Sequence, residues 1–183
     1  MKRATYDDVL NAPEHQVAEI LDGELFLSPR PASRHSLAAF RLGGILAAFD
    51  DDPNGPGGWW LLTEPELHLG DDVVVPDLAG WRRERMPAFP PVAFFSLAPD
   101  WVCEVLSPST ERIDRGRKLR IYADAGVGHA WLVNPLERTL EVLRLRDGAW
   151  TIVAVCSGSE AVRLEPFEAI EMALGRLWVE ASR

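Results

Sequence analysis

Two acidic residues and one lysine could together support chemistry on a phosphodiester. Asp77 ends a run of three valines and a proline, and Glu104 interrupts the apolar segment 101–106. Lys118 follows within the basic stretch 111–120. Magnesium prefers oxygen ligands, and an ammonium group offsets negative charge on a phosphate. If these three side chains converge, they form a minimum set for holding a divalent metal beside a phosphodiester.

The position of Glu104 is the most unusual of the three. The residue lies between Cys103 and Val105 in a segment that is otherwise apolar. A glutamate is almost never fully buried without a partner, so Glu104 either pairs with a basic residue or binds a metal. Asp77 either faces a cleft at the end of a strand or is an ordinary acid in a turn. Pro76 before it removes a backbone donor, which fits the edge or the end of a strand.

Lys118 belongs to a helical stripe, because Asp114, Lys118 and Tyr122 follow one another at intervals of four residues. The lysine either forms a surface pair with Asp114 or points back across the sheet toward the two acids. Glu19 and His35 are further candidates for catalysis. Glu19 adds a carboxylate to the metal cluster, unless it is an exposed acid of a hairpin. His35 contacts phosphate or relays a proton, unless it is a satisfied histidine on an apolar helix face.

The size of the chain fits a single domain over residues 1–183. Its 183 residues are 47% hydrophobic, which is enough for a substantial core. The N-terminus is polar, and no apolar run approaches the ~20 residues of a membrane span, so we expect a cytoplasmic protein with no membrane partner. The two cysteines, Cys103 and Cys156, lie in apolar runs without the spacing of a zinc site, and we expect reduced core thiols.

The net charge of −9 argues against a protein that coats nucleic acid non-specifically, because such binding needs positive charge. It does not exclude a local basic groove, and basic residues do cluster after Glu104. From this cluster we expect Arg112, Arg115 and Arg117 to contact nucleic acid, together with Tyr122 on the same helix. The alternative for any one of these arginines is solvated charge on a helix surface.

The hydrophobic pattern changes between helix and strand periods along the chain. Its clearest local signals are the Asp-Gly pairs at 22–23 and 147–148, which predict an N-terminal and a C-terminal β-hairpin. Predicted helices cover residues 6–10, 33–49 and 111–125, with a short terminal helix within 165–179. Predicted strands cover residues 17–21, 24–28, 59–69, 73–81, 101–106, 129–134, 139–146 and 149–156.

The order of these elements predicts the fold class. The strand–helix–strand crossover from 101 to 133 supplies at least one parallel pair of strands, with the usual right-handed connection. The apolar run at 101–106 indicates a central strand that is covered on both faces. The hairpins add antiparallel pairs, so the sheet is mixed. We therefore predict an α+β fold, a mixed β-sheet flanked by helices with an N-terminal β-hairpin and a C-terminal β-hairpin.

Several short motifs resemble one bacterial family. They are Val75-Pro76-Asp77-Leu78, the run Glu104-Val105-Leu106-Ser107-Pro108-Ser109-Thr110, the set Asp114, Lys118 and Tyr122, then Ala125-Gly126-Val127 and Trp131-Leu132-Val133-Asn134-Pro135. In combination they are similar to the Uma-type family, a bacterial domain of unknown function assigned to the restriction-endonuclease-like, PD-(D/E)XK superfamily. The segments 19–25 and 28–35 match it as well. The resemblance covers residues 6 to 143.

The resemblance implies a restriction-endonuclease-like core with a metal cleft at the acids. It implies Asp77 and Glu104 as metal ligands, the backbone carbonyl of Val105 as a further ligand, and Mg²⁺ or Mn²⁺ as the ion. The chain departs from the superfamily pattern at Leu106, where a lysine is usual. Lys118, displaced onto the following helix, is the natural substitute.

These residues predict a metal-dependent endonuclease that hydrolyses phosphodiester bonds, with DNA as the expected partner. A homodimer would suit cleavage of both strands, and symmetric dimers are the commonest oligomers. One alternative is a catalytically silent nuclease-fold protein that binds nucleic acid or a protein partner, which the net charge and Leu106 favour. A small-molecule hydrolase that uses the same cleft is a third reading.

Overall fold

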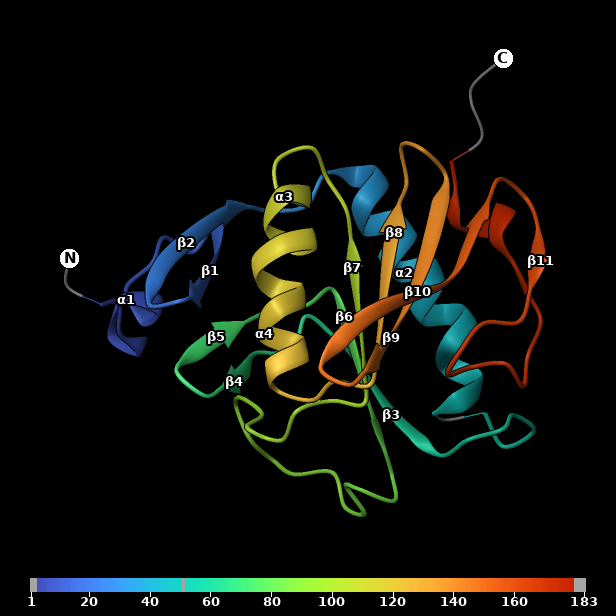
Figure 1. The fold of residues 1–183 in the computed structure, drawn as a ribbon, viewed down its shortest axis with the longest axis horizontal. Coiled ribbons are helices and arrows are strands. Elements are labelled where there is room, and N and C mark those ends of the chain that lie inside the picture. The colour runs from blue at the N-terminus through green and yellow to red at the C-terminus, as the bar shows by residue number, and fades with distance from the viewer. Residues whose placement is uncertain (1–2, 51, 180–183) are drawn as a thin grey trace.

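The computed structural model describes residues 3–50 and 52–179, and its largest element is a six-stranded mixed sheet (Figure 1). The strands follow the order β10-β9-β8-β7-β6-β3. Strands β7 and β8 form the parallel pair that the crossover predicts, and the other neighbours are antiparallel. The bounds are Trp59–Thr63 for β3, Leu78–Arg82 for β6, Trp101–Val105 for β7, His129–Asn134 for β8, Thr139–Arg146 for β9 and Ala149–Ser157 for β10.

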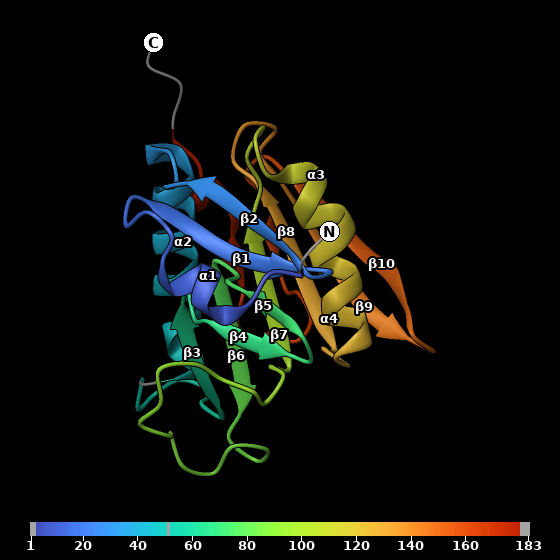
Figure 2. The ribbon, with the colours of Figure 1, turned by 90° about the vertical axis from the view of Figure 1, so that its left-hand side faces the viewer.

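A second sheet of four strands lies beside the first, in the order β2-β1-β5-β4 (Figure 2). Strands β1 and β2 form the predicted N-terminal hairpin, and the turn residues Asp22 and Gly23 both have positive φ, as a tight hairpin turn requires. The predicted C-terminal hairpin is confirmed as well, as β9 paired with β10. The bounds of the second sheet are Gln16–Leu21 for β1, Glu24–Pro29 for β2, Leu67–Leu69 for β4 and Asp72–Val74 for β5.

The predicted strands 59–69 and 73–81 are each broken in two, which corrects the sequence prediction. Together they form one long hairpin whose outer part, β3 with β6, joins the large sheet and whose inner part, β4 with β5, joins the small one. Pro65 and Pro76 lie at the two breaks. A proline cannot donate to a strand ladder, so both strands stop there. The second break leaves Asp77 directly before β6, at the junction of the two sheets.

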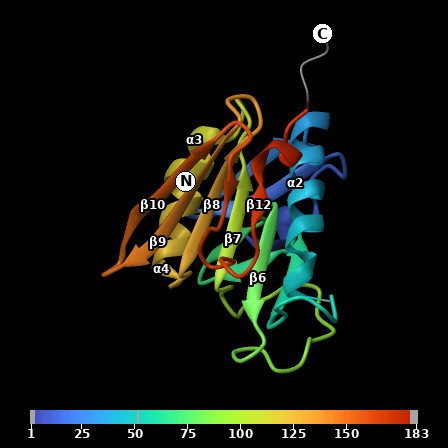
Figure 3. The ribbon, with the colours of Figure 1, turned by 90° about the vertical axis from the view of Figure 1, so that its right-hand side faces the viewer.

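Helices cover both faces of the large sheet (Figure 3). Helix α2 (Ser33–Leu46) packs on one face and continues into the 3₁₀ turn η1 (Ala47–Phe49). On the other face one helical stretch runs through α3 (Glu111–Ile113), the π-helical turn η2 (Asp114–Lys118) and α4 (Leu119–Asp124). The second and third predicted helices are therefore confirmed, apart from the π-helical turn.

The ends of the described chain carry small elements. Helix α1 (Tyr6–Leu10) lies where the sequence predicts it. The predicted helix within 165–179 is wrong in extent, since this segment contains only the 3₁₀ turn η3 (Leu174–Leu177) and the strand β12 (Met172–Ala173), which pairs with β11 (Ala161–Val162). Within the described residues, no helix is both long enough and apolar enough to cross a membrane.

The alternation of side chains along β7 explains why one acid can sit in an apolar strand. Trp101, Cys103 and Val105 point into the core cluster that includes α2. Val102 points the other way, into the cluster that includes α4. Because successive residues of a strand face opposite sides, Glu104 faces α4 as well. The buried acid is thus presented to the helix that carries the predicted lysine.

Candidate metal and catalytic site

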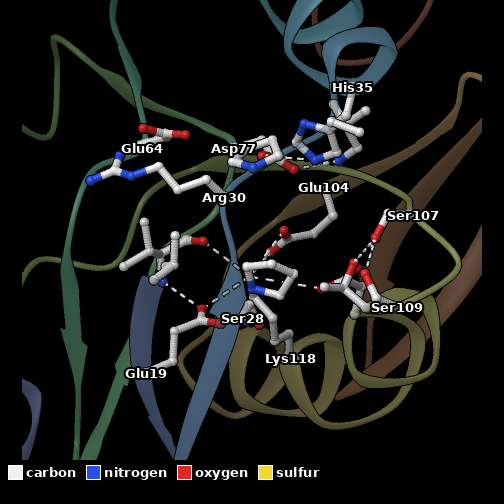
Figure 4. Close-up of a pocket in the computed structure, with 18 of the residues that line it drawn as sticks. Glu19, Ser28, Arg30, His35, Glu64, Asp77, Glu104, Ser107, Ser109 and Lys118 are labelled. Carbon is white, nitrogen blue, oxygen red and sulfur yellow. Dashed lines mark hydrogen bonds and ion pairs between the residues drawn. The ribbon is translucent and has the colours of Figure 1, made fainter. Parts of the chain in front are cut away.

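A cleft of about 310 Å³ opens where β7 ends and β6 begins (Figure 4). Asp77 comes from the break before β6, Glu104 from β7 and Lys118 from the π-helical turn. Glu19 of β1 and His35 of α2 line the same cleft. The structure therefore brings together every residue that the sequence nominates for catalysis.

The ammonium group of Lys118 lies at the centre of this cluster. Its Nζ is 2.9 Å from Glu104 Oε1 and 3.1 Å from Glu19 Oε1, and it donates a hydrogen bond of 3.0 Å to the carbonyl of Val75. Asp114 is farther away, at 3.9 Å. The side chain of Lys118 is 4% exposed. The lysine thus points toward the acids and does not form a surface pair with Asp114.

Lys118 also joins the two sheets. Glu104 belongs to β7 in the large sheet, and Glu19 belongs to β1 in the small sheet. The Glu19 carboxylate accepts a second hydrogen bond, of 2.8 Å, from the backbone N–H of Val75. Glu19 is consequently a buried structural partner of the lysine and not an exposed hairpin acid.

Burial dominates the electrostatics of the cluster. Burial alone would lower the pKa of Lys118, but the carboxylates of Glu104 and Glu19 raise it well above its ordinary value, so the amine stays protonated. Burial raises the pKa of Glu104 well above its usual range, and Lys118 opposes this shift. Burial likewise raises the pKa of Asp114 to about 6. A single lysine therefore faces more buried acid than it can neutralise.

Tyr122 has a different role from the one that the sequence suggests. Its side chain is fully buried, and its hydroxyl donates a 2.5 Å hydrogen bond to Glu104 Oε1. Burial is the main cause of a pKa well above the ordinary value for Tyr122. The predicted contact of Tyr122 with nucleic acid is wrong, because no part of the ring is accessible. The tyrosine instead holds the carboxylate of Glu104.

The π-helical turn carries this inward stripe. Asp114 and Lys118 are the first and last residues of η2, and both are buried, as is Tyr122 one turn later. Single π-helical turns within α-helices are often found at functional sites. The spacing of four residues in the sequence predicts the shared face correctly. It gives no sign of the π-helical geometry.

Asp77 is held by two donors. Its Oδ2 accepts a 2.6 Å hydrogen bond from the backbone N–H of Val105, and its Oδ1 is 3.2 Å from Nε2 of His35. Burial would lower the pKa of His35, but the hydrogen bond and charge of Asp77 outweigh it and raise the pKa overall. The other ring nitrogen of His35, Nδ1, is buried and has no hydrogen-bond partner in the structure. His35 is therefore only half satisfied and not simply a packed core residue.

The donor atoms suit one kind of metal ion. Among the described residues no group of three or more His, Cys, Asp or Glu side chains is arranged to hold a metal. Asp77, Glu104 and Val105 nevertheless line one cleft and offer two carboxylates and a carbonyl. Each carboxylate oxygen keeps lone-pair capacity beyond the single contacts described above. This set fits Mg²⁺ or Mn²⁺ bound through few protein ligands plus water and phosphate, and does not fit an all-protein cage.

The predicted nucleic-acid arginines are differently placed. Arg115 forms ion pairs with Glu111 and Glu141, and Arg117 pairs with Glu24. Arg112 is exposed and makes no ion pair within the part of the chain that the structure describes. Contact of these arginines with nucleic acid stays a prediction, and Arg112 is the one whose charge is available.

The sequence did not single out several other residues that line the cleft. Arg30 follows β2 and lies at the cleft, where its guanidinium donates to a backbone carbonyl, and Glu64 lies near it (Figure 4). The hydroxyls of Ser107, Ser109 and Thr110 form a hydrogen-bonded group at another part of the wall. The location of these hydroxyls in the segment directly after Glu104 was the available signal.

The mixed sheet with helices on both faces, and the cleft at the break between strands, define a nuclease-like α+β fold. The chain belongs to the Uma2 family, whose model carries the description "Putative restriction endonuclease" and matches residues 4–175. A crystal structure from Anabaena variabilis ATCC 29413, described as a putative nuclease belonging to DUF820, is 22% identical. It covers 95% of this chain and 97% of its own, with a TM-score of 0.76. No curated protein matches the chain significantly.

Proposed function

We propose that this protein is a metal-dependent phosphodiesterase of the restriction-endonuclease type and that its substrate is DNA. The observation that carries the proposal is the convergence of Asp77, Glu104 and Lys118 on one cleft from three separate elements. The family description and the description of the Anabaena protein both support a nuclease reaction. The metal and the substrate are inferred from the chemistry of the donor set.

Each residue of the cleft has a role in the proposed reaction. Asp77, Glu104 and the Val105 carbonyl would hold Mg²⁺ or Mn²⁺, which when bound supplies Lewis-acid polarisation of the phosphate and activation of water. Lys118 carries the permanent positive charge that offsets charge developing on the phosphate. His35 fixes the orientation of Asp77 through Oδ1, and Tyr122 fixes that of Glu104.

One observation favours a second candidate, a catalytically silent nuclease-fold protein that binds nucleic acid or a protein partner. Lys118 already contacts both oxygens of Glu104, at 2.9 Å and 3.0 Å, so the acid has a cation without a metal. In this reading the cluster is structural. The two candidates differ in whether the acids bind an ion.

Metal binding and cleavage test the proposal together. We expect Mg²⁺ or Mn²⁺ to bind in calorimetry and to support cleavage of at least one form among single-stranded and duplex DNA and RNA. Asp77→Asn and Glu104→Gln should abolish cleavage and weaken metal binding at least tenfold, since each removes a charged ligand. Glu160→Gln, in an exposed loop away from the cleft, is the matched control and should leave both measurements unchanged.

The outcomes separate the two candidates. Metal binding that depends on both acids, with cleavage that a chelator stops, supports the hydrolase. If the folded protein binds no metal in an acid-dependent way and cleaves none of these substrates, the proposal is wrong. The silent protein is then the better description.

A further inference from the structure

The wall of the cleft is more acidic than that of a groove built for duplex DNA. Its acidic residues are Glu19, Glu64, Asp77, Glu104 and Asp114, against two residues of permanent positive charge, Arg30 and Lys118. The whole chain has a net charge of −9. Duplex binding is dominated by neutralisation of phosphates, and proteins that bind this way make roughly six to ten phosphate contacts. This cleft offers far fewer.

Lys118 is not available to a phosphate outside the reacting centre. Its side chain is 4% exposed and is surrounded by Glu19, Glu104 and the Val75 carbonyl. Its charge is already balanced within the cluster. The cation that lines the cleft and remains accessible is therefore Arg30, which is exposed and forms no ion pair in the described structure.

Most basic residues of the neighbouring helix are also engaged. Arg115 pairs with Glu141, Arg117 with Glu24, and Arg120 with Asp22. These contacts compensate their charge and leave little for a phosphate backbone.

Two exposed arginines next to the cleft remain. Arg34 adjoins His35 at the start of α2, and Arg112 lies in α3 shortly after Thr110, so each is close in sequence to a residue of the wall. Neither arginine forms an ion pair or a side-chain hydrogen bond with another described residue. Together with Arg30, they give isolated positive charges on three separate elements around one cleft.

From this charge distribution we infer that the substrate is a single strand held at about three phosphates, by Arg30, Arg34 and Arg112, and not a duplex. The inference rests on the proposed function and makes it more specific. A single strand is flexible enough to turn its backbone into the recess where Asp77 and Glu104 lie, past separate cations. A duplex presents a rigid array of phosphates, which requires a continuous basic surface.

Binding of fluorescent oligonucleotides tests the inference independently of catalysis. Single-stranded DNA, single-stranded RNA and duplex DNA of one sequence are titrated by anisotropy at several salt concentrations, without added divalent metal. For a single strand with three phosphate contacts, the slope of log K against log salt should be about −2. The affinity should then fall roughly twentyfold between 50 and 200 mM salt, and the duplex should bind more weakly than the strand.

Substitutions assign the contacts. Arg30→Gln should flatten the slope by about 0.7, and the combined change Arg30→Gln, Arg34→Gln and Arg112→Gln should nearly remove the salt dependence. The control is Arg146→Gln with Arg176→Gln, two exposed arginines away from the cleft, which should bind as wild type does. All of these side chains are exposed, and circular dichroism checks that each variant is folded.

Each outcome decides the inference. A shallow slope that depends on the three arginines supports it, and the DNA and RNA strands show which backbone is preferred. A duplex that binds more tightly than the strand with a slope steeper than about −5, or a combined variant that binds normally, overturns it. Strand binding through the arginines with no metal-dependent cleavage would instead overturn the proposed hydrolase and leave the binding surface in place.

Discussion

The Lys118 ammonium lies 2.9 Å from the Glu104 carboxylate, although the two residues are fourteen positions apart and come from a helix and a strand. The superfamily pattern expects the lysine two residues after the acid, where this chain has Leu106. Leu106 is 2% exposed and packs in the core cluster on the α4 side. The helix thus supplies a cation to an acid whose own strand has none to offer.

Removing the lysine should destabilise the fold. Lys118→Met leaves Glu19 and Glu104 buried without a cation, and breaking a buried ion pair in this way costs about 3–5 kcal/mol. Urea denaturation should show a loss of this size. Adding Glu104→Gln to Lys118→Met should restore part of the stability, because it removes one of the stranded charges.

The control for this change is Arg112→Met, which removes an exposed charge without an ion pair in the described structure. Its effect should stay within about 0.5 kcal/mol. A Lys118→Met protein as stable as wild type would contradict the ion-pair assignment.

Asp114 should make stability depend on pH between about 4 and 6. Burial raises the pKa of this carboxyl from 3.8 to about 6 in the folded protein. The protonated form is therefore favoured by folding, and its contribution, fully present below pH 3.8, is lost as the pH rises through about 6. A shift of this size corresponds to about 3 kcal/mol.

The variant Asp114→Asn cannot ionise and should escape this loss. We expect it to be more stable than wild type at pH 7.5, by up to about 3 kcal/mol, and to show no such gain at pH 3.5. Chemical denaturation of both proteins at the two pH values measures the difference. A gain of equal size at both pH values would contradict the titration of Asp114.

Two tyrosine-to-phenylalanine changes should separate site from scaffold. Tyr122→Phe removes the 2.5 Å hydrogen bond to Glu104, and Tyr6→Phe removes a 2.7 Å hydrogen bond to Glu66. Each loses a hydrogen bond to a carboxylate, worth roughly 1.5–3 kcal/mol where it is buried. Only the change at Tyr122 should also weaken metal binding, since only its partner lines the cleft.

Calorimetry with Mn²⁺ and thermal denaturation provide the two readouts. Equal metal affinity in Tyr122→Phe and Tyr6→Phe would mean that the orientation of Glu104 does not matter for the ion.

His35 should stabilise the fold more in acid than in alkali. Burial lowers and Asp77 raises the pKa of His35, with a net rise above 6.5. The resulting stability is fully present below pH 6.5 and is lost as the pH rises through the folded-state pKa. His35→Gln should therefore be more destabilising at pH 5.5 than at pH 8.5, measured by urea denaturation.

The control for this prediction is His15→Gln, because His15 is exposed and forms no ion pair with a described residue. Its small effect should be the same at both pH values. If His35→Gln has the same effect at pH 5.5 and at pH 8.5, the ion pair with Asp77 does not form in solution.

Local patterns in the sequence predict the positions of the main elements and the members of the site. Asp-Gly turns, helical spacing and an acid inside an apolar strand each report on neighbouring residues, and these predictions are confirmed. The shared inward face of Asp114, Lys118 and Tyr122 follows from the same local logic.

The parts that the sequence does not predict depend on contacts between distant segments. The hydrophobic pattern runs straight through Pro65 and Pro76, so it gives no sign that two strands change sheets there. Tyr122 carries a ring that suits nucleic-acid stacking, and only its burial against Glu104 shows that it faces inward. Arg30 joins the cleft because β2 ends beside it, which no local pattern records.

The bridge that Lys118 makes between Glu104 in the large sheet and Glu19 in the small one has a consequence for the history of such proteins. The residues proposed for catalysis also hold two sheets together. A descendant that lost every need to cut nucleic acid would still be selected to keep the lysine and its acids, because losing them would unfold it. Retention of these residues in a relative would therefore testify to folding as much as to enzymatic activity.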